Sequence, residues 1–143
     1  MPSSDAPLTG SCACGAVAFE VTAPFQSAGY CHCKRCQRRS GALWSMNAIV
    51  GADGFAIVRG RENVHAWSPP DQGLPKAFCA ECGGHLYSDG GDFIVVRLGT
   101  VDGDPGIRPS GANGSNLRPT GSRSRTTAPR ASRSDDRPDV NAT

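Results

Sequence analysis

The sequence predicts a small, mainly β domain followed by a disordered tail, and two observations support this prediction. First, apolar residues recur in short alternating runs separated by glycine-rich turns, and no segment keeps a helical period over ten or more residues. Second, all nine aromatic residues lie at or before Phe93, so the residues suited to a core are confined to the first part of the chain. The length of 143 residues fits one domain with a tail.

The expected strands follow one another from the N-terminal side. Gly15–Thr22 alternates apolar and polar side chains, and Pro24 ends that run because proline cannot donate a ladder hydrogen bond. The other strand-like runs are Ala42–Val50, Phe55–Arg59, Val64–Trp67, Lys76–Phe78, His85–Ser88 and Phe93–Leu98. Tyr30–Arg39 is expected to be a polar, basic loop, and Ser68–Pro75 a proline-containing loop. Trp44 is expected in the core.

Charge and composition divide the chain near residue 106. Residues 1–106 carry eight Lys and Arg against ten Asp and Glu, whereas residues 107–143 carry seven Arg against three Asp and few large apolar side chains. The latter segment cannot bury enough apolar surface to offset its ordering entropy. We therefore expect a flexible N-terminus over 1–8, a folded domain over 9–106 and a disordered Arg- and Ser-rich tail over 107–143.

Two function classes are disfavoured by the sequence. No apolar run approaches the roughly 20 residues of a membrane span, and the first residues lack the basic and apolar regions of an export signal. A cytoplasmic protein that does not engage a membrane is the expectation. Nucleic-acid binding through the basic tail is a weaker alternative, because the tail has no aromatic residues for base stacking.

Seven cysteines stand in three close groups within the expected domain. The groups are Cys12-x-Cys14, Cys31-x-Cys33-x2-Cys36 and Cys79-x2-Cys82. An odd number cannot pair completely into internal disulfides, and close spacing in a reducing compartment favours metal binding. Disulfides and plain buried thiols are the alternatives. Because a domain of about 100 residues has a limited core, metal staples would contribute strongly to its stability.

Seven thiolates divide into a group of four and a group of three, which would hold two zinc ions. A four-thiolate site is closed and therefore structural, whereas a three-thiolate site leaves one coordination position open and is potentially catalytic. Cys31, Cys33 and Cys36 occur in one loop, so they are the candidate open site. The remaining four, which would join the first strand to the last hairpin, are Cys12, Cys14, Cys79 and Cys82. A second structural site completed by His32 or His85 is the alternative.

Basic residues surround the group of three. Lys34, Arg35 and Arg38 are the candidate substrate-binding residues, because cations near an open site attract anionic substrates and favour the thiolate form of an incoming thiol. A solvated basic loop is the plain alternative.

The ordered set of motifs resembles a known family. The segments Gly10–Val17, Cys31–Cys36, Ser40–Ala42, Phe78–Gly83, Leu86–Tyr87 and Val96–Thr100 occur in this order. Together they are similar to the glutathione-dependent formaldehyde-activating enzymes, also called the centromere protein V family. The resemblance implies a β-rich Mss4-like fold and two zinc ions, the structural one on the group of four cysteines and the catalytic one on the group of three. It also implies a carbon–sulfur lyase that joins a small-molecule thiol, glutathione or an analogue, to formaldehyde or another small aldehyde. A non-catalytic zinc-stapled binding module and an inactive truncated family member are the alternatives.

The end of the chain departs from that family, which continues with tryptophans and a Pro-Asp-Asp-Gly-like stretch. Possible codons for Gly111–Arg130, read in a shifted frame, permit Gln-Trp-Val-Glu-Ser-Ala-Ala-x-Trp-Phe-Pro-Ile-Pro-Asp-Asp-Gly. We therefore expect that residues from about 107–112 onward are read out of frame, which would impair activity.

Overall fold

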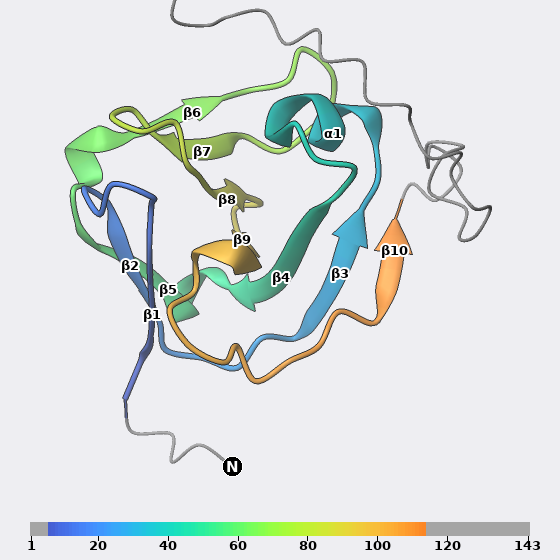
Figure 1. The fold of residues 1–143 in the computed structure, drawn as a ribbon. Coiled ribbons are helices and arrows are strands. Elements are labelled where there is room, and N and C mark those ends of the chain that lie inside the picture. The colour runs from blue at the N-terminus through green and yellow to red at the C-terminus, as the bar shows by residue number, and fades with distance from the viewer. Residues whose placement is uncertain (1–5, 114–143) are drawn as a thin grey trace, which may run out of the picture.

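The chain forms two β-sheets that pack around a shared core (Figure 1). The computed structural model describes residues 6–113. The smaller sheet has the order β1-β2-β5 and consists of β1 (Leu8–Ser11), β2 (Ala18–Val21) and β5 (Phe55–Arg59). The larger sheet has the order β10-β3-β4-β9-β8-β7-β6. Its strands are β3 (Ser27–Cys31), β4 (Ser45–Gly51), β6 (Val64–Trp67), β7 (Lys76–Cys79), β8 (His85–Asp89), β9 (Phe93–Arg97) and β10 (Gly111–Asn113). The predicted mainly β fold class is confirmed.

The core lies between the smaller sheet and one face of the larger sheet. Phe19 of β2 is fully buried. The centroid of its ring lies 5.2 Å from that of Phe55, and the centroid of the Phe55 ring lies 4.9 Å from that of Tyr87. Gly10 makes this packing possible, because a Cβ at that position would lie 2.2 Å from the Phe19 ring. Trp44 is 45% exposed, so its predicted place in the core is wrong.

The α-helix α1 (Lys34–Ser40) follows β3 where the sequence predicted a loop over Tyr30–Arg39. Cys33 is its N-cap, accepting a hydrogen bond on Sγ from the backbone N–H of Cys36 at 3.4 Å. Gly41 ends the helix at φ +72°, a left-handed conformation that favours glycine. A seven-residue helix is too short to show a period, and a cysteine cap is not a usual helix-start signal. The structure therefore corrects the loop assignment.

Ordered segments lie across both predicted domain boundaries. β1 begins at Leu8, and β10 pairs in parallel with β3 beyond residue 106. The backbone N–H of Ser110 also donates to the carbonyl of Ala28 at 3.1 Å. Backbone pairing to a sheet edge needs no apolar side chains, so composition could not predict it. The rest of the predicted tail and of its shifted frame, residues 114–143, lies outside the described residues.

Short 3₁₀ turns connect several strands, namely η1 (Ala52–Gly54), η2 (Arg61–Asn63) and η3 (Leu98–Thr100). Within residues 6–113, no helix has the length and apolar character needed to cross a membrane.

Candidate metal centres and adjoining cavity

The first candidate metal centre brings together two cysteine pairs that lie far apart in the sequence. Cys12 and Cys14 follow β1, Cys79 ends β7, and Cys82 lies in the turn that leads to β8. The four sulfurs lie within 4.8 Å of one another, with 3.6 Å between Cys12 and Cys14 and 3.9 Å between Cys14 and Cys79. Four thiolates at the tetrahedral Zn–S distance are separated by about 3.8 Å, so these residues fit a four-coordinate ion.

Tight turns hold these sulfurs in place. Gly83 adopts φ +74°, and its N–H donates to the carbonyl of Cys79 at 2.8 Å, which closes the turn between the two ligands. The N–H of Val17 donates to Cys12 Sγ at 3.3 Å. Backbone N–H groups of Cys14 and Gly84 lower the pKa of Cys82 to about 6. Such a thiol is largely ionised at neutral pH, which is the form that binds a metal.

The second candidate centre lies where β3 meets α1. Cys31 ends β3, Cys33 caps the helix and Cys36 lies in its first turn, and the three sulfurs are within 4.8 Å of one another. Burial and the adjacent thiols of Cys33 and Cys36 raise the pKa of Cys31 to about 12, so ionisation of all three requires a nearby cation. Among residues 6–113, the potential metal-ligand groups of this kind contain no histidine, so neither His32 nor His85 completes the set. Three thiols can hold an ion with one coordination position free.

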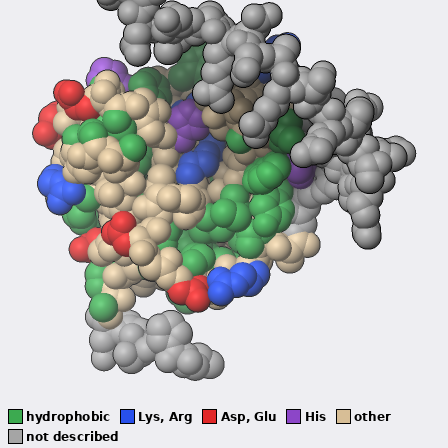
Figure 2. Space-filling view, in the orientation of Figure 1, with side chains coloured by type: hydrophobic (Ala, Val, Ile, Leu, Met, Phe, Trp, Pro, Cys, Tyr) green, Lys and Arg blue, Asp and Glu red, His purple; other side chains and the backbone are tan. Residues whose placement is uncertain are grey.

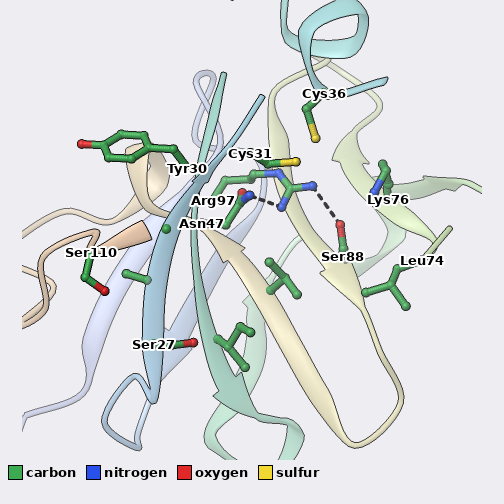
Figure 3. Close-up of a pocket in the computed structure, with 14 residues that line it drawn as sticks. Ser27, Tyr30, Cys31, Cys36, Asn47, Leu74, Lys76, Ser88, Arg97 and Ser110 are labelled. Atoms are coloured by element: carbon green, nitrogen blue, oxygen red, sulfur yellow. Dashed lines mark hydrogen bonds between the residues drawn. The ribbon is translucent and has the colours of Figure 1, made fainter. Parts of the chain in front are cut away.

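A cavity of about 350 Å³ adjoins the second centre (Figure 3). Its walls come from β3, β4, β7, β8 and β9, and Cys31 and Cys36 lie at one end. Residues of β4 and β9 alternate, so that Asn47 and Arg97 face the cavity while Val50 and Val96 are fully buried in the core. The large sheet therefore has one face in the core and one face toward the candidate site.

Two cations line this cavity. Arg97 is only 9% exposed and Lys76 only 8%. The Arg97 guanidinium lies between two neutral acceptors, donating to Asn47 Oδ1 and to Ser88 Oγ at 2.8 Å each. Sequence analysis missed both residues. The available signals were the basic residue ending the apolar run of β9 and the lysine that opens β7.

The predicted substrate residues lie around a different depression, of about 570 Å³. Lys34, Arg35 and Arg38 line it together with Trp67. Arg35 forms an ion pair with Asp71, and Lys34 Nζ donates to Gln37 Oε1 at 2.9 Å. Their position outside the cavity suits long-range attraction of anions.

His85, which opens β8, lies against a narrow space that is also lined by Cys36, Arg39 and Arg97. Burial and the two arginine charges lower the pKa of His85 to about 4 from its ordinary 6.5. Because the folded state favours the neutral imidazole, the stability that this group contributes is present above pH 6.5 and is lost as the pH falls toward 4.

We expect acid to destabilise the wild-type chain more than the His85→Gln variant. Between pH 7.5 and 5, the free energy of unfolding of the wild type should fall by about 1–2 kcal/mol more than that of the variant, after allowance for solvent screening. Urea unfolding of both chains at each pH measures this difference. Protonation of the cysteine thiolates occurs in both chains, so its contribution cancels in the comparison. Parallel pH dependences of the free energy of unfolding would contradict a neutral, half-buried imidazole at His85 in the folded state.

Comparisons with known proteins identify relatives of the chain. A family model described as glutathione-dependent formaldehyde-activating enzyme matches residues 7–113. The chain is 28% identical over 87 residues to a Sordaria macrospora protein and 29% identical over 85 residues to a Halomonas elongata protein, and both are named as glutathione-dependent formaldehyde-activating enzymes. These alignments cover 57% and 56% of this chain but 36% and 54% of the relatives, so the chain spans about half or less of their length. A solved Rhodobacter sphaeroides structure matches 74% of this chain and 100% of its own with TM-score 0.60 and 24% identity, which shows a shared fold.

Proposed function

The chain belongs to the glutathione-dependent formaldehyde-activating enzyme family, and from this premise we propose that it is a zinc-dependent carbon–sulfur lyase. Its reaction joins a glutathione-like thiol to formaldehyde or another small aldehyde, as in S-hydroxymethylglutathione formation. The observation that carries the proposal is the three-thiol group beside a cavity lined by cations. The proposed location is the cytoplasm.

The two cysteine groups have different roles in this proposal. Cys31, Cys33 and Cys36 hold the catalytic zinc, and the structural zinc is held by Cys12, Cys14, Cys79 and Cys82. When bound to the three thiolates, zinc would supply an open coordination position that favours the thiolate form of an external thiol and a Lewis-acidic charge near the aldehyde oxygen.

The net reaction is an addition. The thiol sulfur forms a bond to the aldehyde carbon, the C=O π bond breaks, and the thiol proton ends on the new hydroxyl oxygen. The chain's contribution is to place thiol and aldehyde together and to surround the developing oxyanion with positive charge. Lys34, Arg35 and Arg38, at the neighbouring depression, attract the anionic thiol toward the site.

The proposal is tested by zinc content and aldehyde exchange. Purified chain should contain two zinc ions, one of which mild chelation removes first. NMR exchange spectroscopy with glutathione and formaldehyde should show transfer of the aldehyde between its free and thiol-bound forms above the spontaneous rate. Chelated chain and thiol-free samples are the controls. Two tightly held ions without catalysed exchange would instead support a zinc-stapled binding module.

A further inference from the structure

The positive charge around the cavity is not balanced within the described part of the chain. The ion pairs of residues 6–113 are Arg35–Asp71 and Arg108–Asp104, and neither involves a cavity residue. Arg97 donates its guanidinium N–H groups to two neutral acceptors, and the side-chain ammonium of Lys76 takes part in none of the ion pairs formed among the described residues. Burying a cation without a counter-charge is costly, so an anion is expected to complete this site when it is in use.

The thiolates of Cys31, Cys33 and Cys36 supply only part of the negative charge that these cations require. Arg39, Lys76 and Arg97 gather with Cys36 around one narrow space, and burial together with the charge of Arg97 lowers the pKa of Lys76. A divalent ion with three thiolates carries a net charge of −1, against three cations. The site therefore retains positive charge after metal binding. In Figure 2, a basic side chain and a histidine lie side by side near the middle of the visible face, and other basic and acidic side chains are spread over the rest of it.

The position of the two cations indicates which kind of anion the cavity would bind. Arg97 and Lys76 line the cavity of about 350 Å³ that opens beside Cys31 and Cys36, and the hydrogen bonds from Asn47 and Ser88 fix the guanidinium of Arg97 (Figure 3). A guanidinium held in this way has free N–H groups for a planar, two-oxygen acceptor. Leu74, Ile49 and Val95 add apolar surface that suits a short carbon chain.

We propose that Arg97 and Lys76 form a carboxylate-binding subsite, which selects thiols that carry a carboxylate on a short chain from the sulfur. Asn47 and Ser88 are positioning residues, since they act through the Arg97 side chain. This proposal rests on the proposed function, because it assumes that the thiol reaches the three-cysteine centre. It assigns substrate recognition to the strand face of the cavity and leaves Lys34, Arg35 and Arg38 with attraction from outside.

The test compares two probes that share one thiol and one carbon chain, 3-mercaptopropionate and its methyl ester. Calorimetric titration of the zinc-loaded full chain should show that the carboxylate binds at least about tenfold more tightly than the ester. Lys76→Met should reduce that preference to about threefold or less while leaving the hydrogen bonds of Arg97 intact. If the Arg97→Gln variant folds, it should show the same reduction in the preference for the carboxylate probe. Arg61→Gln, which removes an exposed arginine of η2, should keep the wild-type preference.

The possible outcomes separate the subsite from the reaction. Equal binding of the two probes to the wild type, no binding of either up to about 10 mM, or an unchanged preference in Lys76→Met would overturn the subsite. Loss of zinc from Arg97→Gln together with an unchanged preference in Lys76→Met would assign the cations to charge balance of the metal centre alone. A carboxylate preference without catalysed aldehyde exchange would uphold the subsite and reject the proposed function. Catalysed aldehyde exchange without a preference for the carboxylate probe would uphold the proposed function and reject the subsite.

Discussion

Replacing Cys79 by serine is expected to unfold most of the chain at room temperature. Cys79 is fully buried, it ends β7, and its sulfur lies 3.9 Å from that of Cys14, 65 positions away in sequence. Loss of one ligand from a closed four-thiolate site removes metal-binding free energy that is available only to the folded state. We expect the free energy of unfolding to fall by about 5 kcal/mol, which approaches the whole stability of a domain of this size.

Circular dichroism melts and zinc content per chain measure this effect. Cys33→Ser is the matched control, because it makes the same chemical change in the other cysteine group. It should keep one zinc and a melting temperature within a few degrees of the wild type. If Cys79→Ser melts at the wild-type temperature, the four-cysteine group is not a structural metal site.

Local patterns account for the part of the fold that the sequence could predict. β5 and β6 lie at the predicted residues, and β8 and β9 differ from the predicted runs by one residue at an end. These strands were predictable because the alternation of side chains between turn signals is a local property of the chain. β1 and β3 escaped prediction. Both are short and contain a glycine and small or polar residues, so their strand conformation depends on pairing with β2 and β4.

The cavity could not be predicted because it depends on register between distant strands. Asn47 of β4 lies opposite Arg97 of β9, and Lys76 of β7 lies opposite Ser88 of β8. A shift by one residue in either pair would turn these side chains to the other face of the sheet. No local signal sets those registers. The cysteine spacing, by contrast, already separated the thiols into the same two sets that the structure brings within 4.8 Å.

The chemistry of α1 makes Cys33→Ser the sharpest test of the second centre. Serine is among the best N-cap residues, so its hydroxyl can accept the hydrogen bond that the Cys36 N–H now gives to Cys33 Sγ. It is a poor ligand for a thiolate-type metal site. The substitution therefore removes a proposed zinc ligand while it preserves the start of the helix.

We expect Cys33→Ser to fold, to contain one zinc instead of two, and to lose at least about 10³-fold in the catalysed exchange of aldehyde with glutathione. Cys33→Ala should show the same loss of zinc and exchange, with a further decrease of about 1 kcal/mol in the free energy of unfolding, because alanine cannot cap α1. The two variants therefore separate the two roles of Cys33. Both lack the thiolate ligand, but only Cys33→Ala also loses the helix cap, so the difference in their free energies of unfolding reports the cap alone. A Cys33→Ser chain that retains two zinc ions and wild-type exchange would show that the three-cysteine group is not the reacting centre, even though Cys31 and Cys36 line the cavity.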